Sequence, residues 1–453
     1  MGNNVKRREE PGKGIRKSLE LWAEAEKLIP GGAQLISRRP HMFAFGVTPI
    51  FAERAEGAYF WDVDGTRYLD MTMSVGAVLL GYRDSAVENA VNEQQRKSTI
   101  FSVLHPIEVE MARLLTEVIP CGEMVRFGKS GGEANAVAVR IARAFTNRDK
   151  VAFCGYHGWH DWYLSANLAG SNSLDSHLLP GVNARGVPKA LSGTSLPFEY
   201  NNIDSLKSVF EKNQGEIACV IMEASRIQLP QEGFLEQVRN MAHENGALLI
   251  FDEVVTGFRL AVGGAQQFYN VTPDLATYGK TIANGYPLTA IAGRREVMEI
   301  SKDLFISSTF WDDNCSLAAG VATVQKMKRE RVAEQVTARG RQYMKEWQRL
   351  ADRLKISANI MGMGPSSSIV FDEVGAINRK QLMALYVQEM ARQGVFGGGV
   401  LNVCLSHGDR EIDLVLAAAE EALAVVRKVE SEADLRKYLE AQEQREIFTR
   451  RLV

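Results

Sequence analysis

The chain has 453 residues, of which 45% are hydrophobic and 24% are charged, and its formal net charge at pH 7 is −2. This length and composition are ordinary for a soluble globular protein with two or three domains. The charge gives no sign of the basic surface that attracts nucleic acids or anionic membranes, so we expect neither as a partner.

The sequence lacks the patterns of export, membrane insertion and metal binding. No apolar segment follows the charges of the first ten residues, so we expect no signal peptide. No apolar run approaches the ~18 residues of a membrane span. The five cysteines form no C-x-x-C pair, and His157 and His160 lack the neighbours of a zinc site. The sequence therefore predicts a cytoplasmic protein with reduced thiols and no metal.

The first predicted element is a β-hairpin over residues 58–70. Aromatic and apolar residues flank Asp64-Gly65, a dipeptide that is typical of the tight turn between two antiparallel strands.

The central part of the chain alternates apolar runs with helical patterns. Residues 151–153, 217–222 and 247–251 are short apolar runs bounded by turns or charges, as in buried parallel strands. Helical patterns cover residues 133–146 and 233–245. This alternation predicts an α/β fold with a doubly wound, mostly parallel sheet, whose ligand lies outside the carboxyl ends of the strands. Further along, residues 316–346 predict one long helix and residues 430–451 a charged, solvated helix.

A glycine-rich segment, residues 127–135, precedes the first of these helices. Glycines allow close backbone approach, and the free N–H groups at a helix N-terminus bind anions such as phosphate. The leading glycine of a nucleotide P-loop would fall at Glu123, so the segment is not a P-loop. A glycine-rich structural turn remains the alternative.

Two other segments have side chains that suit a ligand. Tyr156 follows the strand at residues 151–153, where an aromatic ring could stack on a flat heterocycle or simply serve packing. The hydroxyl groups at residues 307–309 could donate to a phosphate.

Lys280 and Asp252 form the most informative pair. Lys280 lies in a turn-rich, mostly uncharged segment, and a lysine drawn into such a setting can act as an amine nucleophile toward a carbonyl. Asp252 ends an apolar run 28 residues upstream. Pyridoxal 5′-phosphate (PLP) needs such a lysine and an acid against its pyridinium nitrogen, so the pair predicts PLP as the cofactor.

Together these segments resemble the class III, fold-type I PLP-dependent transaminases, most closely the branch that includes the glutamate-1-semialdehyde aminomutases. The resemblance runs from residue 28 to residue 407, and its most specific parts are residues 251–259 and 140–150. It implies a large PLP-binding domain over residues 76–325. A smaller α+β domain would combine the N-terminal segment, residues 1–75, with the C-terminal residues 326–453.

The resemblance also implies roles for individual residues. Lys280 would hold the cofactor as an internal aldimine, and Asp252 would keep its pyridine nitrogen protonated. Val254 would pack beneath the ring and Tyr156 would stack above it. The residues that would hold the phosphate are Ser130, Gly131, Gly132 and, from the neighbouring subunit, Thr309, which implies a homodimer.

The chain departs from the family pattern at several positions. Gly132 stands where the family usually has threonine, and Lys129 could compensate by its charge. Val75 replaces a tryptophan of the aminomutases, Gly399 lies where they place a glutamate, and residues 311–314 replace their Ser-Gly-Asn-Pro. Cofactor residues are retained and substrate residues are altered, which favours a transaminase with its own substrate.

We therefore expect an enzyme that moves an amino group from a small-molecule amino donor to a carbonyl acceptor. Arg38 aligns with an arginine that can bind a substrate carboxylate, and a surface arginine on an N-terminal loop is the equally open alternative. Three other functions stay open. One is the glutamate-1-semialdehyde 2,1-aminomutase reaction, and another is a lyase or epimerase reaction that uses the same aldimine. The third is non-catalytic PLP binding or a scaffold role, against which the intact Lys280 and Asp252 argue.

Overall fold

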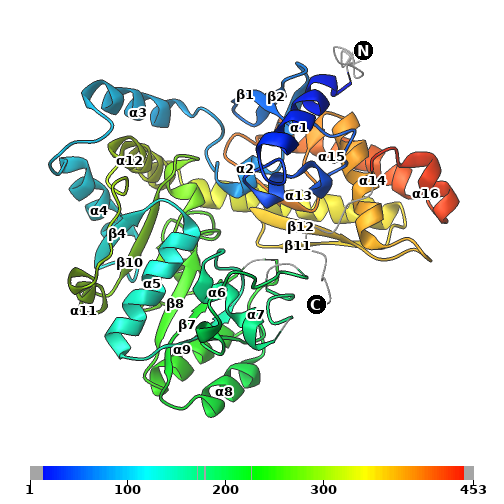
Figure 1. Ribbon diagram of the computed structural model, residues 1–453. Helices are drawn as coiled ribbons and strands as arrows, with labels where there is room; N and C mark the ends of the chain where they lie inside the picture. The colour runs from blue at the N-terminus through cyan, green and yellow to red at the C-terminus, as the bar shows by residue number, and fades with distance from the viewer. Residues whose placement is uncertain (1–13, 171, 178–179, 226, 443–453) are drawn as a thin grey trace. The chain divides into compact units, whose positions relative to one another are not determined.

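The computed structural model of the chain describes residues 14–442, except 171, 178–179 and 226 (Figure 1). The first ten residues, where we expect no signal peptide, lie outside the described part. The chain divides into two compact units. The described part of unit 1 comprises residues 14–75, 81–83 and 338–442, and that of unit 2 comprises residues 76–80 and 84–337 with the gaps given above.

Unit 2 is built on a seven-stranded sheet. Its strands, in spatial order, are β4 (Met124–Gly128), β10 (Thr289–Gly293), β9 (Leu275–Tyr278), β8 (Leu248–Glu253), β7 (Ile217–Met222), β5 (Lys150–Cys154) and β6 (Ser195–Pro197). Strand β10 is antiparallel to both of its neighbours, whereas the pairs from β9 to β6 are parallel. The predicted α/β fold with a mostly parallel sheet is confirmed.

The predicted apolar runs correspond to central strands of this sheet. Every residue of β7 and of β8 is buried, as expected for strands that are covered on both faces. The predicted helices correspond to α5 (Gly131–Thr146) and α9 (Phe234–Glu244).

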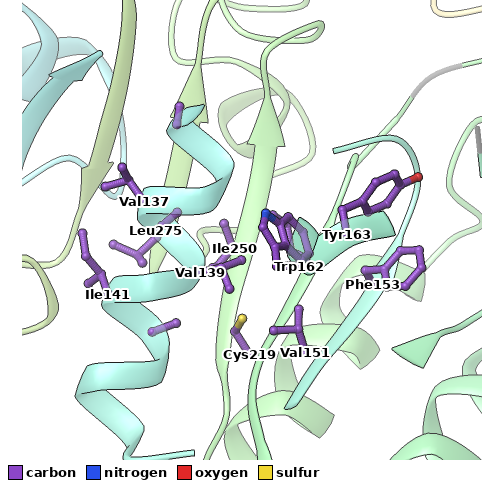
Figure 2. Close-up of a cluster of buried hydrophobic side chains, with 14 of the residues drawn as sticks. Val137, Val139, Ile141, Val151, Phe153, Trp162, Tyr163, Cys219, Ile250 and Leu275 are labelled. Atoms are coloured by element: carbon purple, nitrogen blue, oxygen red, sulfur yellow. The ribbon is translucent and has the colours of Figure 1, made fainter. Parts of the chain in front are cut away.

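Helix α5 packs its apolar side along one face of the sheet (Figure 2). Each fully buried aliphatic side chain of this kind stabilises the fold by roughly 1.5–3 kcal/mol. The packing fixes the direction of α5, so that its first turn follows directly on the carboxyl end of β4. The labelled side chains of this buried cluster include Val137, Val139 and Ile141 of the helix and Val151, Cys219, Ile250 and Leu275 of the strands.

The remaining elements of unit 2 are shorter or more peripheral. They are α3 (Ser85–Lys97), α4 (Pro106–Val118), α6 (Asp161–Leu164), α7 (Ala166–Ala169), α8 (Ile203–Lys212), α10 (Ala265–Phe268), α11 (Arg295–Met298), α12 (Asn314–Arg329) and the 3₁₀ helices η3 (Lys189–Leu191), η4 (Lys280–Ala283) and η5 (Glu299–Asp303).

The prediction of one helix over residues 316–346 is wrong. Helix α12 ends at Arg329, and α13 (Val332–Arg353) starts a new helix. Between them Arg331 has φ 51°, a left-handed conformation that interrupts the right-handed helix. The boundary between the units falls inside α13, beyond the residue 325 that the sequence suggested.

Unit 1 contains two small sheets and several helices. The sheets are β1 (Ala52–Glu56), β2 (Tyr59–Asp62), β3 (Arg67–Asp70) and β13 (Val395–Phe396), and β11 (Ala358–Gly362), β12 (Ser366–Phe371) and β14 (Val400–Asn402). The helices are α1 (Arg16–Leu28), η1 (Ile36–Arg38), η2 (Pro40–Met42), α2 (Met73–Gly76), α14 (Arg379–Arg392), α15 (Asp409–Val426) and α16 (Glu432–Tyr438), besides α13.

Two sequence predictions concern unit 1. Strands β2 and β3 pair antiparallel around Asp64-Gly65, so the predicted hairpin is confirmed, and Gly65 has the positive φ of 88° that this turn requires. The charged C-terminal helix is shorter than predicted in the described part, because α16 ends at Tyr438; residues 443–451 of that prediction lie outside it.

Three properties bear on the class of protein. Within residues 14–442, apart from the gaps, no helix has the length and apolarity to cross a membrane. No group of three or more His, Cys, Asp or Glu side chains in that part could hold a metal ion. All five cysteines are buried free thiols, and burial raises the pKa of Cys121, Cys154 and Cys219 to about 12.

Candidate active site

The carboxyl ends of neighbouring strands gather most of the predicted site residues at one edge of the sheet of unit 2. Ser130 follows β4, Tyr156 follows β5, Asp252 is the penultimate residue of β8, and Lys280 follows β9. These strands share one direction, since β10 is antiparallel to both β4 and β9. The edge is the place where a doubly wound sheet binds its ligand.

Asp252 is held by three hydrogen bonds. Its Oδ2 accepts from Asn135 Nδ2 at 2.7 Å and lies 2.8 Å from His157 Nδ1, and its Oδ1 accepts from the N–H of Val254 at 3.0 Å. The side chain is almost fully buried. Because a carboxylate has about four acceptor positions, Oδ1 keeps capacity for a further donor.

The contacts of His157 determine where its hydrogens lie. Its Nε2 lies 3.2 Å from the carbonyl oxygen of Cys154, which can only accept, so Nε2 carries a hydrogen. The Nδ1–Oδ2 contact of 2.8 Å joins the ring to Asp252 by a second hydrogen bond.

Two further side chains, Asn135 and Thr277, orient Asp252. Asn135 Oδ1 accepts from Thr277 Oγ1 at 2.6 Å, which directs the amide nitrogen of Asn135 toward Asp252. Thr277 is the register partner of Asp252 across β8 and β9. The sequence analysis missed Asn135, His157 and Thr277 as site residues. The available signals were that His157 follows Tyr156 at a strand end and that Asn135 is a polar residue on the apolar side of α5.

Lys280 has an unusual backbone conformation. It begins η4 directly after β9, its φ is 43°, and it is half-buried. A non-glycine residue in this region costs on the order of 1–3 kcal/mol, and such strain clusters at functional sites.

The side chain of Val254 lies against two glycines, Gly131 and Gly279, near Lys280. A Cβ atom on Gly131 would lie 3.1 Å from a methyl group of Val254, and a Cβ atom on Gly279 would lie 3.3 Å from it. The glycines therefore let the first turn of α5 and the residue before Lys280 both approach Val254. This brings Val254, Gly131 and Lys280 together, as the sequence predicted for a cofactor site.

The first turn of α5 has the features of an anion site. Ser130 is the N-cap of α5, and its hydroxyl accepts from the N–H of Glu133. The positive end of the helix dipole and the free N–H groups of the first turn favour a phosphate there. The residues present thus fit a phosphorylated, flat heterocycle that has Asp252 for its nitrogen and Lys280 for its aldehyde.

Lys129 does not point its charge at a free anion site. Its Nζ pairs with Asp313 Oδ2 at 3.1 Å, and Asp313 also accepts from Ser316 Oγ at 2.5 Å. Burial alone would raise the pKa of Asp313, but the hydrogen bond from Ser316 and the charge of Lys129 outweigh it and lower that pKa. Lys129 therefore has a structural partner already.

The other predicted site residues lie on more open parts of the chain. Tyr156 is 40% exposed, and its N–H donates to Glu223 Oε2 at 3.0 Å. Thr309 is exposed in the segment between η5 and α12. Arg38 belongs to unit 1, where its guanidinium donates to Ser74 Oγ at 2.7 Å. The roles of these three residues stay predictions.

Comparison with known proteins gives one family. The family model described as aminotransferase class-III matches residues 42–407. A protein of Cloacimonas acidaminovorans named 3-aminobutyryl-CoA aminotransferase is 34% identical over 92% of this chain and 98% of its own length. The glutamate-1-semialdehyde 2,1-aminomutase of Alkaliphilus oremlandii is 37% identical over 91% of this chain and 100% of its own.

The fold has close counterparts among solved structures. The PLP internal aldimine form of the FumI protein of Sphingopyxis sp. MTA144 has a TM-score of 0.83 to this chain. It is 24% identical, and the match covers 95% of this chain and 99% of that protein. The fold-type I architecture is thereby confirmed.

Proposed function

Because the chain belongs to the aminotransferase class-III family, we propose that it is a transaminase that moves an amino group from an amino donor to a separate carbonyl acceptor. PLP is the cofactor of this family of enzymes. When bound, PLP supplies an electron sink. It accepts the electron pair that is left on the substrate Cα when the Cα–H bond breaks.

The residues of unit 2 perform the parts of this chemistry that the protein must supply. Lys280 Nζ would take the proton from the substrate Cα as a general base and would then deliver it, as a general acid, to the aldehyde-derived carbon of bound PLP. Asp252 holds a proton on the pyridine nitrogen, and the donors Asn135 and His157 keep its carboxylate in position. The first turn of α5 binds the phosphate.

The observation that carries the transaminase proposal is the lack of a side chain at position 399. A Cβ atom on Gly399 would have a single neighbour, Met383 Cε, at 4.0 Å. The carbonyl of Gly399 accepts from the N–H of Ile369 and from Ser368 Oγ, so its backbone is well held. A Cβ atom would fit there, so packing around the backbone does not exclude a side chain at position 399.

Position 75 supports the same conclusion. Met73, Ser74 and Val75 have φ of 44°, 53° and 58°, a left-handed turn that Asp70 Oδ1 stabilises by accepting from the N–H of Met73. Val75 is β-branched, so its side chain is unfavourable in this left-handed conformation, and it is 36% exposed. The position where the aminomutases have a tryptophan therefore carries a small side chain in a strained turn.

Residues 311–313 have structural contacts in the described chain. Trp311 packs against the core cluster of unit 2, and Asp313 is the N-cap of α12. The proposal therefore depends on positions 75 and 399.

The aminomutase reaction is the second candidate, supported by the 37% identity to the Alkaliphilus oremlandii protein. A non-catalytic scaffold is disfavoured, because such a protein needs neither the strained lysine nor the buried Asp252–His157 pair. An exposed arginine is suited to a carboxylate, so Arg38 is proposed as the substrate-carboxylate ligand. The buried free thiols support a cytoplasmic location.

A direct comparison of reactions tests the proposal. The purified holoenzyme is given glutamate-1-semialdehyde alone, or a keto acid with glutamate, alanine, 3-aminobutyryl-CoA or a simple amine as donor. We expect amino transfer from at least one donor and slow 5-aminolevulinate formation. The Gly399→Glu variant should lower transfer without loss of PLP. Efficient 5-aminolevulinate formation with no external transfer would overturn the proposal in favour of the aminomutase.

A homodimer is part of the proposed function. Unit 2 has large apolar side chains that are 60–86% exposed, on two segments that meet where the N–H of Asn314 donates to Thr99 O at 2.9 Å. Thr309 lies exposed on one of these segments, as a ligand for the neighbouring subunit's phosphate would be. The occupant of the surface is therefore a second copy of the chain. The apolar residues are Val103, Leu104, Val109, Phe305 and Phe310.

A further inference from the structure

Gly132 is the position of the phosphate segment at which this chain lacks the family's threonine, and its surroundings explain the loss. A Cβ atom on Gly132 would lie 3.0 Å from His160 Nδ1 and 3.2 Å from His160 Cε1. Gly158 approaches from the same loop, since its own Cβ would lie 2.6 Å from the Cα of Gly132. The imidazole of His160 thus occupies the space beside the first turn of α5 that a threonine side chain would need.

His160 has a polar atom that nothing in the described chain satisfies. Its Nδ1 is buried and makes no hydrogen bond to the described residues, and one face of its ring stacks on Trp159 with the centroids 4.5 Å apart. Leaving a buried polar atom unpaired is unfavourable, so a ligand atom that paired with Nδ1 at this position would be stabilising. Burial lowers the pKa of His160, and a neutral imidazole can carry its single hydrogen on Nδ1.

The other polar groups of this turn do not replace the missing threonine hydroxyl. Lys129 pairs with Asp313. The hydroxyl of Ser130 accepts from the N–H of Glu133 and keeps its own hydrogen for a phosphate, but it is one hydroxyl where the family has two.

We propose that His160 replaces that hydroxyl and donates a hydrogen bond from Nδ1 to the phosphate of PLP at the N-terminus of α5. The inference rests on the proposed function, since the phosphate is that of its cofactor. The glycine at position 132 and the presence of His160 then have one cause. A threonine side chain at position 132 and the imidazole of His160 would occupy the same space.

The test compares the affinity of the apoprotein for PLP with its affinity for pyridoxal, which has the same ring and aldehyde but no phosphate. Both are measured by absorbance titration. His160→Phe keeps an aromatic ring against Gly132 and Trp159 but removes the donor. We expect it to weaken PLP by about 10- to 100-fold, the value of one hydrogen bond to a charged group, and to leave pyridoxal unchanged. His160→Asn, whose amide can reach a similar position, should restore part of the loss.

A second set of variants tests the exchange itself. Gly132→Thr alone should weaken PLP, because the new Cβ would lie 3.0 Å from Nδ1 of His160. Gly132→Thr combined with His160→Ala restores the hydroxyl and removes the ring, so it should bind PLP more tightly than either single variant. Such a non-additive cycle indicates direct coupling between the two positions.

Two outcomes would overturn the inference. One is an unchanged ratio of PLP to pyridoxal affinity in His160→Phe, whether neither ligand or both ligands lose affinity; the other is additive effects in the double variant. A wild-type protein that binds PLP tightly and discriminates against pyridoxal, yet transfers no amino group, would refute the proposed function and leave this inference standing.

Discussion

His157 Nδ1 lies 2.8 Å from Asp252 Oδ2, in the interior of unit 2, where neither side chain has more than 5% exposure. The ring is fixed from its other side by the carbonyl of Cys154, so it cannot turn away. Low local dielectric strengthens such a contact, and it also makes the loss of either partner costly. The acid that faces the cofactor nitrogen is therefore half of a buried pair whose partner comes from a different strand end.

Replacing Asp252 with asparagine should abolish most activity while the protein still folds. The amide cannot hold a proton on the pyridine nitrogen, so we expect kcat/KM to fall by at least about 100-fold. The matched control is Asp274→Asn, a buried carboxylate directly before β9 that pairs with Arg294 and His243. The control should lower the thermal midpoint and retain amino transfer. Equal losses of activity in both variants would contradict the role of Asp252.

Replacing His157 with leucine should reduce activity less. The change removes one of the three hydrogen bonds to Asp252, which is worth about 10-fold in kcat/KM. The PLP content of the purified protein, measured by absorbance, should stay close to one per chain. His243→Leu removes the corresponding contact to Asp274 and should leave kcat/KM unchanged. A normal pH profile and normal kcat/KM in His157→Leu would show that the ring serves packing alone.

Replacing Lys280 with alanine should abolish turnover and leave the fold intact. The lysine is half-buried and strained, so it contributes chemistry rather than core packing, and a variant without it should not unfold at a lower temperature. Borohydride reduction of the wild type followed by peptide mapping should place the cofactor on Lys280. Cofactor recovered on another lysine would refute the assignment.

Replacing Leu104 with glutamate should weaken the proposed dimer. Leu104 is 83% exposed, so the change is neutral for the isolated chain but would place a charge in an apolar interface. Sedimentation should show a dimer for the wild type and a larger monomer fraction for the variant, together with lost activity. Leu414→Glu, an exposed leucine of unit 1, is the control and should remain dimeric. A fully active wild-type monomer at assay concentration would contradict the dimer.

Acid should destabilise unit 1 through His407. Burial lowers the pKa of His407 to about 4, while Cys404 N–H donates to its Nδ1 and its Nε2 donates to Asp70 O. The unfolded chain binds the proton near the ordinary pKa of ~6.5, so stability is full above that value and falls as pH drops toward 4. We expect a loss of about 2 kcal/mol between pH 7.5 and 5.

Calorimetry at the two pH values measures this loss as a lower thermal midpoint. His407→Gln removes the titrating group and should reduce the difference between the midpoints. An unchanged pH dependence in His407→Gln would assign the acid sensitivity to other groups.

The sequence by itself determined the elements whose signal is local. Apolar runs predicted β5, β7 and β8, because strands covered on both faces need continuous apolar residues. Lys280 and Asp252 were predicted as a pair from their local surroundings. A lysine in a turn-rich, mostly uncharged segment and an aspartate at the end of an apolar run have few roles other than chemistry. The glycines before α5 predicted the anion site for the same reason, since helix N-termini have free N–H groups wherever they occur.

Only the tertiary structure decided how the polar groups of the site are connected. Asn135 is 117 residues from Asp252 and 142 from Thr277, and their hydrogen bonds depend on the register of β8 with β9 and on the packing of α5. The conflict between Gly132 and His160 depends in the same way on how closely two backbones approach. A local pattern carries no information on such distances, because they are set by the packing of elements that are far apart in the chain.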